Sequence, residues 1–298
     1  MRRLLLFAAV ASLSCGNEID RSIALVTAPR ILAVRAEPPE SLPGGAVTYT
    51  ALAATASGSD AQAGIEWSFC SVSASLTDDS PVSSACITTP ATALASGNVV
   101  TLATPMDACR RFGPQGMPAQ AGKPPPQPTA PDPTGGYHQP VLLYWQDDVT
   151  AALERLTCNP TGVSLDLSQT YRDTRRPNQN PLLLPLATDV NGEIVDLTAV
   201  AADAVVHLSA LWSPESVESY VTIDVMQQEL IWHTEKLWVA WFVAGGALDH
   251  DVSEPIGAET GVDNLWRMPA TAGVFHLWTV LHDDRGGIDF AETEIIVR

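Results

Sequence analysis

Short runs of β-forming residues, each ended by turn residues, recur along most of this 298-residue chain. They have the length of strands and are too short for stable helices. Regularly spaced short strands predict antiparallel sandwiches rather than a helical bundle. A short helix competes with a strand only at 148–156, where Asp148 could serve as its N-cap. The runs cover 31–34, 47–53, 65–70, 99–103 and 141–145 in the first half, and 205–212, 221–225, 237–243, 274–281 and 293–297 in the second.

The length suggests about two domains. We predict a first domain over 30–172, a linker over 173–180 and a second domain over 181–298. Within the first domain, residues 105–140 hold ten of the 23 prolines and no apolar periodicity, which indicates an insertion. The boundary region carries three arginines that we expect to pair with acidic neighbours, with phosphate or carboxylate binding as the alternative. They are Arg172, Arg175 and Arg176.

The N-terminus reads as an export signal. Two arginines precede an apolar run over 4–13 that is too short to span a bilayer. The residues Ala11-Ser-Leu-Ser-Cys15 then resemble the bacterial lipobox, although Ser12 occupies a place where an aliphatic residue is usual. The resemblance implies that 1–14 is a lipoprotein signal peptide and that Cys15 carries an acyl group such as palmitate. Gly16 at the next position implies the outer membrane, with 15–29 as a tether and the lipid as the membrane partner.

Four further cysteines lie in the first half of the chain. An even number of cysteines in an exported protein indicates disulfides. Three pairings are open, and we favour the one between neighbours, which closes one loop with Cys70 and Cys86 and another with Cys109 and Cys158. A zinc site is the alternative, but no close pair of cysteines and no adjacent histidine supports it.

The charge balance excludes one class of partner. The chain has 34 acidic residues against 16 basic ones, a net charge of −18. Nucleic acid and anionic membrane surfaces would repel such a protein.

Two passages combine tryptophan-bearing strands with characteristic turns, residues 31–70, and residues 237–246 with 266–269, 272–280 and 283–287. The first places a tryptophan-bearing strand after two turns, and the second has a Trp-rich strand, a Gly-Gly turn and a closing hairpin. These passages resemble PKD-like and other immunoglobulin-like modules of bacterial surface proteins. The resemblance implies two such antiparallel sandwiches in tandem, of the kind found in uncharacterised cell-surface lipoproteins. The immunoglobulin spacing of Cys, Trp and Cys is absent.

Five acidic residues suggest a calcium site, because carboxylate oxygens are the ligands that Ca²⁺ prefers. They would have to meet at one end of the second sandwich, and no EF-hand order supports the site. No other cofactor is expected. The five residues are Asp249, Asp251, Glu254, Asp283 and Asp284.

No catalytic motif for a serine hydrolase, zinc peptidase or nucleotide-binding enzyme occurs. We therefore expect a non-enzymatic, lipid-anchored envelope protein that acts as a binding or spacer module for an envelope protein or polysaccharide. The alternative is a carbohydrate-binding or hydrolytic protein that uses loop carboxylates and exposed tryptophans. Burial of Trp212, Trp232 and Trp266 would disfavour that alternative, and we expect Trp241 to lie in the core.

Overall fold

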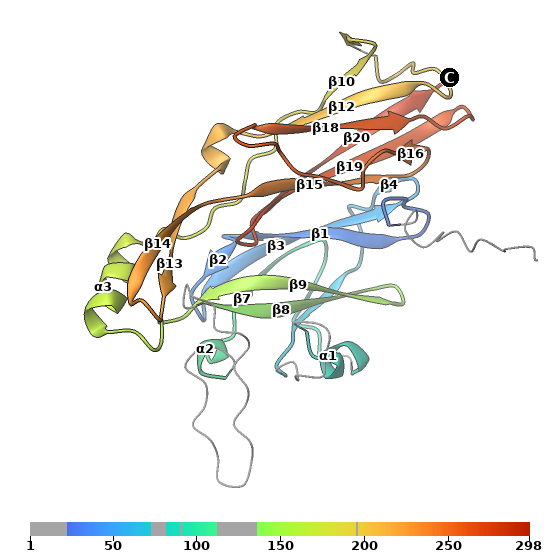
Figure 1. Ribbon diagram of the computed structural model, residues 1–298. Helices are drawn as coiled ribbons and strands as arrows, with labels where there is room; N and C mark the ends of the chain where they lie inside the picture. The colour runs from blue at the N-terminus through green and yellow to red at the C-terminus, as the bar shows by residue number, and fades with distance from the viewer. Residues whose placement is uncertain (1–22, 73–81, 90, 112–135, 195) are drawn as a thin grey trace, which may run out of the picture.

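The computed structural model describes residues 23–72, 82–89, 91–111, 136–194 and 196–298. The predictions for the signal peptide, for Cys15 and for residues 112–135 of the proline-rich insertion therefore lie outside the described residues. Within them the fold is all-β, as predicted, with antiparallel sheets arranged as two sandwiches (Figure 1).

The first sandwich consists of two sheets whose opening strand changes partner. β1 pairs with β3, and the chain then crosses over so that β2 pairs in parallel with β9 of the opposite sheet. This exchange is typical of an immunoglobulin-like sandwich. One sheet contains β1 (Arg30–Glu37), β3 (Ala46–Thr55), β4 (Gly58–Ser59) and β7 (Val99–Ala103). The other contains β2 (Glu40–Ser41), β9 (Asp148–Thr157), β8 (Gly136–Trp145), β5 (Glu66–Phe69) and β6 (Ala95–Ser96).

The second sandwich repeats this plan. Val200 forms a parallel bridge to Val297 in the last strand, which corresponds to the crossover of the first sandwich. One sheet contains β11 (Glu193–Ile194), β10 (Ala187–Val190), β12 (Val205–Leu211), β18 (Gly261–Arg267) and β16 (Ala247–Leu248). The other contains β17 (Val252–Ser253), β15 (Leu237–Val243), β19 (Gly273–Asp283) and β20 (Ile288–Val297).

A separate hairpin extends from the second sandwich between β12 and β15. It follows a 3₁₀ turn (Pro214–Ser216) and consists of β13 (Ser219–Asp224) and β14 (Glu229–Thr234). Helix α3 (Leu165–Thr174) packs on it through Tyr171, which contacts the cluster formed by Val221 and Ile223. The helix begins at an N-cap, where the side chain of Ser164 accepts a hydrogen bond from the Leu167 amide.

Each sandwich has a tryptophan in its centre, on equivalent strands. Trp67 on β5 and Trp241 on β15 are both fully buried. The prediction for Trp241 is confirmed, because alternation along β15 directs Val239, Trp241 and Val243 into the core. Leu277, Ile295 and Val297 pack in the same core, and Phe275 contacts it while only partly buried.

The two sandwiches stack face to face. Figure 1 shows the sheet of β1 and β3 next to the sheet of β15, β19 and β20, which gives four layers. A cluster with members from both sandwiches fills this interface, and Trp278 at its centre donates a hydrogen bond from Nε1 to the Ser59 hydroxyl at 2.9 Å. The fully or nearly buried members are Val26, Ala33, Leu52, Ala54, Trp278 and Val280.

Residues of the predicted tether also join the second sandwich. Ala24 and Val26 are buried, and both hydrogen-bond to the backbone of Val243 in β15. The described end of the tether is therefore held against the sheet that the first sandwich covers.

The competing helix at 148–156 is wrong. The residues form β9, which pairs with β8 from Asp148 to Thr157. The reason is tertiary: Ala151 and Ala152 contact two different clusters on opposite faces of the sheet, an arrangement that requires strand periodicity.

Two disulfides join the cysteines as neighbours, as predicted. One links Cys70 to Cys86 in helix α1 (Ser84–Thr88), and the other links Cys109 in helix α2 (Ala108–Arg111) to Cys158. Each therefore holds one short helix against the outer sheet of the first sandwich.

Candidate functional site

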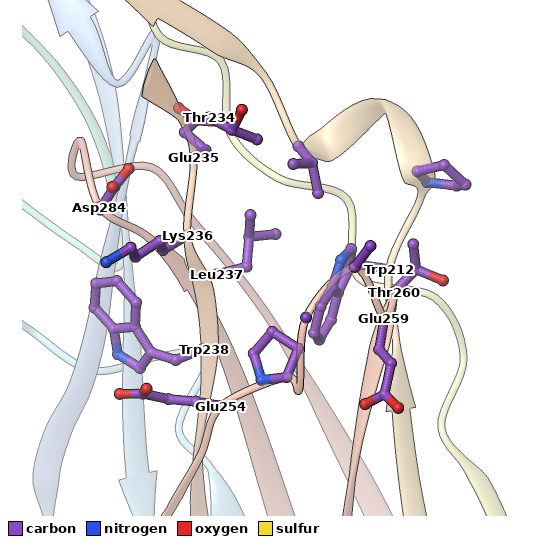
Figure 2. A pocket seen from close by; sticks show the side chains of 15 residues that line it. Trp212, Thr234, Glu235, Lys236, Leu237, Trp238, Glu254, Glu259, Thr260 and Asp284 are labelled. Carbon is purple, nitrogen blue, oxygen red and sulfur yellow. The ribbon is translucent and has the colours of Figure 1, made fainter. Parts of the chain in front are cut away.

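A cavity of about 720 Å³ opens in the second sandwich between the base of the β13–β14 hairpin and the loop that joins β17 to β18 (Figure 2). We call it the hairpin cavity. Its volume lies within the range of small-molecule and peptide-binding pockets. Its apolar lining is Trp212, Pro214, Val217, Leu237, Trp238, Pro255 and Ala258, and its polar lining includes Thr234, Glu235, Lys236, Glu254, Glu259, Thr260 and Asp284.

Strand periodicity places the two tryptophans of the hairpin cavity differently. Trp212 follows β12 and is 1% exposed. Trp238 alternates with the inward residues of β15, so it lies on the opposite face and is only half-buried. Its ring stacks on His282, with centroids 5.3 Å apart and planes inclined by 7°. Burial lowers the pKa of His282 to about 4, so this ring is neutral at neutral pH.

The rim of the hairpin cavity is acidic. Glu254, Glu259 and Asp284 are exposed, and none of the three forms an ion pair with another described residue. Lys236 is also exposed and without an ion pair in the described ranges. Figure 2 shows Lys236, Trp238 and Asp284 on one side of the cavity and Glu259 on the other.

A fourth carboxylate in the wall, that of Glu235, already has an ion pair and a hydrogen bond within the protein. Glu235 is buried, and burial raises its pKa to about 7 although Arg285 opposes this. Arg285 binds both Glu235 and Glu218, the latter at 2.6 Å. The Glu218 amide also donates to Glu235, so the pair fixes the base of the hairpin.

One polar group in the wall lacks a partner. The indole N–H of Trp212 is buried and donates to no acceptor among the described residues. A buried donor without an acceptor costs about 1–3 kcal/mol, so it marks a place where an acceptor is missing.

The structure does not assemble the predicted calcium site. Asp283 is buried, and its carboxylate accepts hydrogen bonds from the amides of Arg285 and Gly287 and from the Asn178 side chain. Glu254 and Asp284 line the hairpin cavity, whereas Asp249 and Asp251 do not. Across the described ranges, no group of three or more Asp, Glu, His or Cys side chains is placed to hold a metal ion. Strand and turn geometry therefore do not bring these five carboxylates together in one group.

The predicted tryptophan platform is not formed either. Trp212 and Trp266 are buried, and only Trp232 of the three is exposed, at 62%. A shared aromatic face for a sugar ring therefore does not exist among them.

One of the three boundary arginines behaves as predicted. Arg175 binds Glu40 of the first sandwich at 2.7 Å. Arg172 instead binds Ser168 and Gln169 of its own helix, and the carbonyl of Arg176 accepts a hydrogen bond from Arg285.

The segment between the sandwiches is held by both of them. The Asn178 amide donates to Glu40 of the first sandwich, and its side chain donates to Asp283 of the second. Asn180 likewise donates to the Ala36 carbonyl and accepts from the Ile288 amide. These contacts cross from one sandwich to the other, which fixes their relative position.

Glu254 and Asp284 were predicted as site residues, but the cavity that they line was not predicted. The sequence around Lys236 and Trp238 contains one indication of a site. A charged residue directly precedes strand β15, and both faces of that strand are apolar. No helix among the described residues is long and apolar enough to cross a membrane.

Comparisons with known proteins do not assign a family. No family model and no curated protein matches the chain. Among solved structures, the D0-D1 domain of intimin covers 89% of this chain and 98% of its own, at 10% identity and a TM-score of 0.24. The D00-D0 domain of intimin covers 89% and 100%, at 9% identity and a TM-score of 0.27. The adhesin InvE of Yersinia pseudotuberculosis covers 89% and 58%, at 9% identity and a TM-score of 0.25. At TM-scores this low, the likeness identifies neither a family nor a function for the chain.

Proposed function

We propose that this protein is a non-enzymatic binding module of the bacterial cell envelope, anchored to the outer membrane by a lipid on Cys15. The observation that carries the binding role is the hairpin cavity, which combines an apolar wall with ionisable groups that are free of ion pairs. Such a combination is the usual composition of a ligand site.

The groups beside the hairpin cavity support binding rather than proton transfer. Glu235 has a pKa near 7, which would suit a general base, but Arg285 and the Glu218 amide occupy its oxygens. His282 is covered by Trp238 and has a low pKa. Both groups with strongly shifted pKa values therefore serve the packing of the site.

The stacked sandwiches support a role as a rigid carrier. Interfaces between domains usually allow motion unless they are large and hydrophobic. Here a buried cluster centred on Trp278 and the double clamp on Asn178 join the sandwiches. The hairpin cavity is thus held in a fixed position relative to the segment that follows the tether.

The anchor is tested by mass spectrometry of the N-terminus of protein purified from bacterial membranes. We expect an acylated Cys15 as the first residue, and a C15S variant that is either left unprocessed or released from the membrane fraction. The S14A variant keeps a small residue before the cysteine and should stay membrane-bound, which makes it the matched control. An unmodified N-terminus that begins elsewhere, or a C15S variant that is processed and membrane-bound like the wild type, would refute the anchor.

A further inference from the structure

We propose that the hairpin cavity binds a basic peptide segment, with a lysine or arginine side chain of the peptide entering between Glu254, Glu259 and Asp284. This inference rests on the proposed binding function and adds the chemical class of the ligand.

The charge of the rim points to a cation. Three carboxylates without ion pairs lie on the rim together with one lysine, so the rim carries an excess of negative charge. Lys236 is the single lysine in the described part of the chain, and no described arginine forms an ion pair with these three carboxylates. Clefts with walls of one charge sign and low dielectric constant concentrate ligands of opposite charge. A basic ligand is therefore attracted, and an acidic one is repelled.

The apolar wall suits the stem of such a side chain. Lysine and arginine carry several methylene groups behind the charge, and these groups pack on apolar surfaces. Leu237, Trp238 and Pro255 line the hairpin cavity, and Figure 2 shows Trp238 beside Glu254. A cation near an indole face is also attracted by the electrons of the ring.

The missing acceptor points to a peptide. Trp212 lines the hairpin cavity, and its indole N–H lacks an acceptor in the described part of the chain. A peptide presents a carbonyl oxygen at every residue, so an extended segment supplies an acceptor beside its charged side chain.

A carbohydrate fits this site less well. Sugar recognition relies on a broad aromatic face, but Trp212 is almost wholly buried and one face of Trp238 is covered by His282. The aromatic area left for stacking is therefore small, whereas the free carboxylates remain.

The test is fluorescence anisotropy with the purified full chain and four labelled probes. The probes are tetra-arginine amide, tetra-lysine amide, tetraglutamate and maltohexaose. Basic probes should bind, and binding should weaken at high salt because exposed charges are screened. Tetraglutamate and maltohexaose should not bind at the same concentrations.

Two variants with equal loss of charge separate the site from the general field of an acidic protein. The first carries E254Q, E259Q and D284N in the hairpin cavity. The second carries E66Q, D147N and E294Q, which change exposed carboxylates outside it. The cavity variant should lose at least ~10-fold in affinity for the basic probes, equivalent to about 1.4 kcal/mol, and the control should change less than ~2-fold.

Three outcomes would overturn the inference. Equal loss in both variants would show attraction by net charge alone. Binding of maltohexaose that the cavity variant abolishes would assign the site to carbohydrate. Absence of binding by both basic probes would refute the peptide class, while acylation of Cys15 and membrane fractionation would still test the anchor independently.

Discussion

Replacing Trp278 by alanine should loosen the joint between the two sandwiches. The side chain is fully buried among Val26, Leu52 and Ala54, all of which precede the second sandwich in the chain. Its indole N–H also donates to the Ser59 hydroxyl. The substitution therefore removes apolar contacts across the interface and one hydrogen bond.

The magnitude follows from these contacts. Truncation of a buried tryptophan to alanine costs about 3–5 kcal/mol, from lost transfer free energy and the cavity left behind. Loss of the hydrogen bond adds about 1 kcal/mol. Because the lost contacts lie in the interface, the free energy that couples the unfolding of the two sandwiches should decrease most. We expect the wild type to melt in one transition and Trp278→Ala to melt in two.

Differential scanning calorimetry measures this directly. The matched control is Trp232→Ala, which removes an indole that is 62% exposed and should cost less than ~1 kcal/mol. If Trp278→Ala melts in one transition at the temperature of Trp232→Ala, the stacked interface does not contribute to stability and the rigid-carrier argument fails.

Further predictions concern the cores, one buried acid and the thiols. Trp241→Ala should lower the free energy of unfolding by about 3–5 kcal/mol, and urea unfolding that matches wild type would contradict its burial. Burial raises the pKa of Glu154 to about 8, so its proton is lost on unfolding above its ordinary pKa. The free energy of unfolding should therefore fall as the pH rises from about 4.5 to about 8, and Glu154→Gln should flatten this slope; an unchanged slope would refute the assignment. Thiol titration of the denatured native protein should find the four cysteines of the described domains oxidised, and reduction should cost about 3–4 kcal/mol per disulfide in the chain-entropy model; two or more free thiols would contradict the pairing.

The strands were predictable where the signal is local. In 237–243, strand periodicity groups Trp241 with Val239 and Val243 on one face, although both faces are apolar, and the Gly-Gly pair at 286–287 predicts the closing hairpin, where Gly286 adopts a φ of +100°. The residues of β9 contain no such signal, because alanines on both faces fit helix and strand equally well. Only pairing with β8 decides between them.

The interface between the two sandwiches is indicated in the sequence by a strand that does not alternate between apolar and polar residues. β19 is apolar on both faces, with Leu277 and Leu281 inward and Trp278 and Val280 outward. A strand without alternation indicates a sheet covered on both sides. The sequence therefore predicts that a second layer covers this sheet, but it does not predict that the first sandwich is that layer.

The hairpin cavity was beyond prediction for a physical reason. Its walls come from four places in the chain, including Trp212, Lys236 and Glu259, which meet only after β12 and β18 have paired in one sheet and β15 has joined the other. For the same reason the five acidic residues of the calcium prediction are not gathered into one group among the described residues, since closeness in sequence does not determine where a loop directs each carboxylate.

The stacking of the sandwiches also determines what either half of the chain can do alone. A fragment of residues 181–298 would expose the outward faces of β15, β19 and β20 to water, with Phe242, Trp278, Val280 and Phe290 on them. Contiguous apolar surface of this kind promotes self-association. The two sandwiches are therefore not independent domains that could be rearranged, duplicated or expressed separately, because each one shields an apolar face of the other from water.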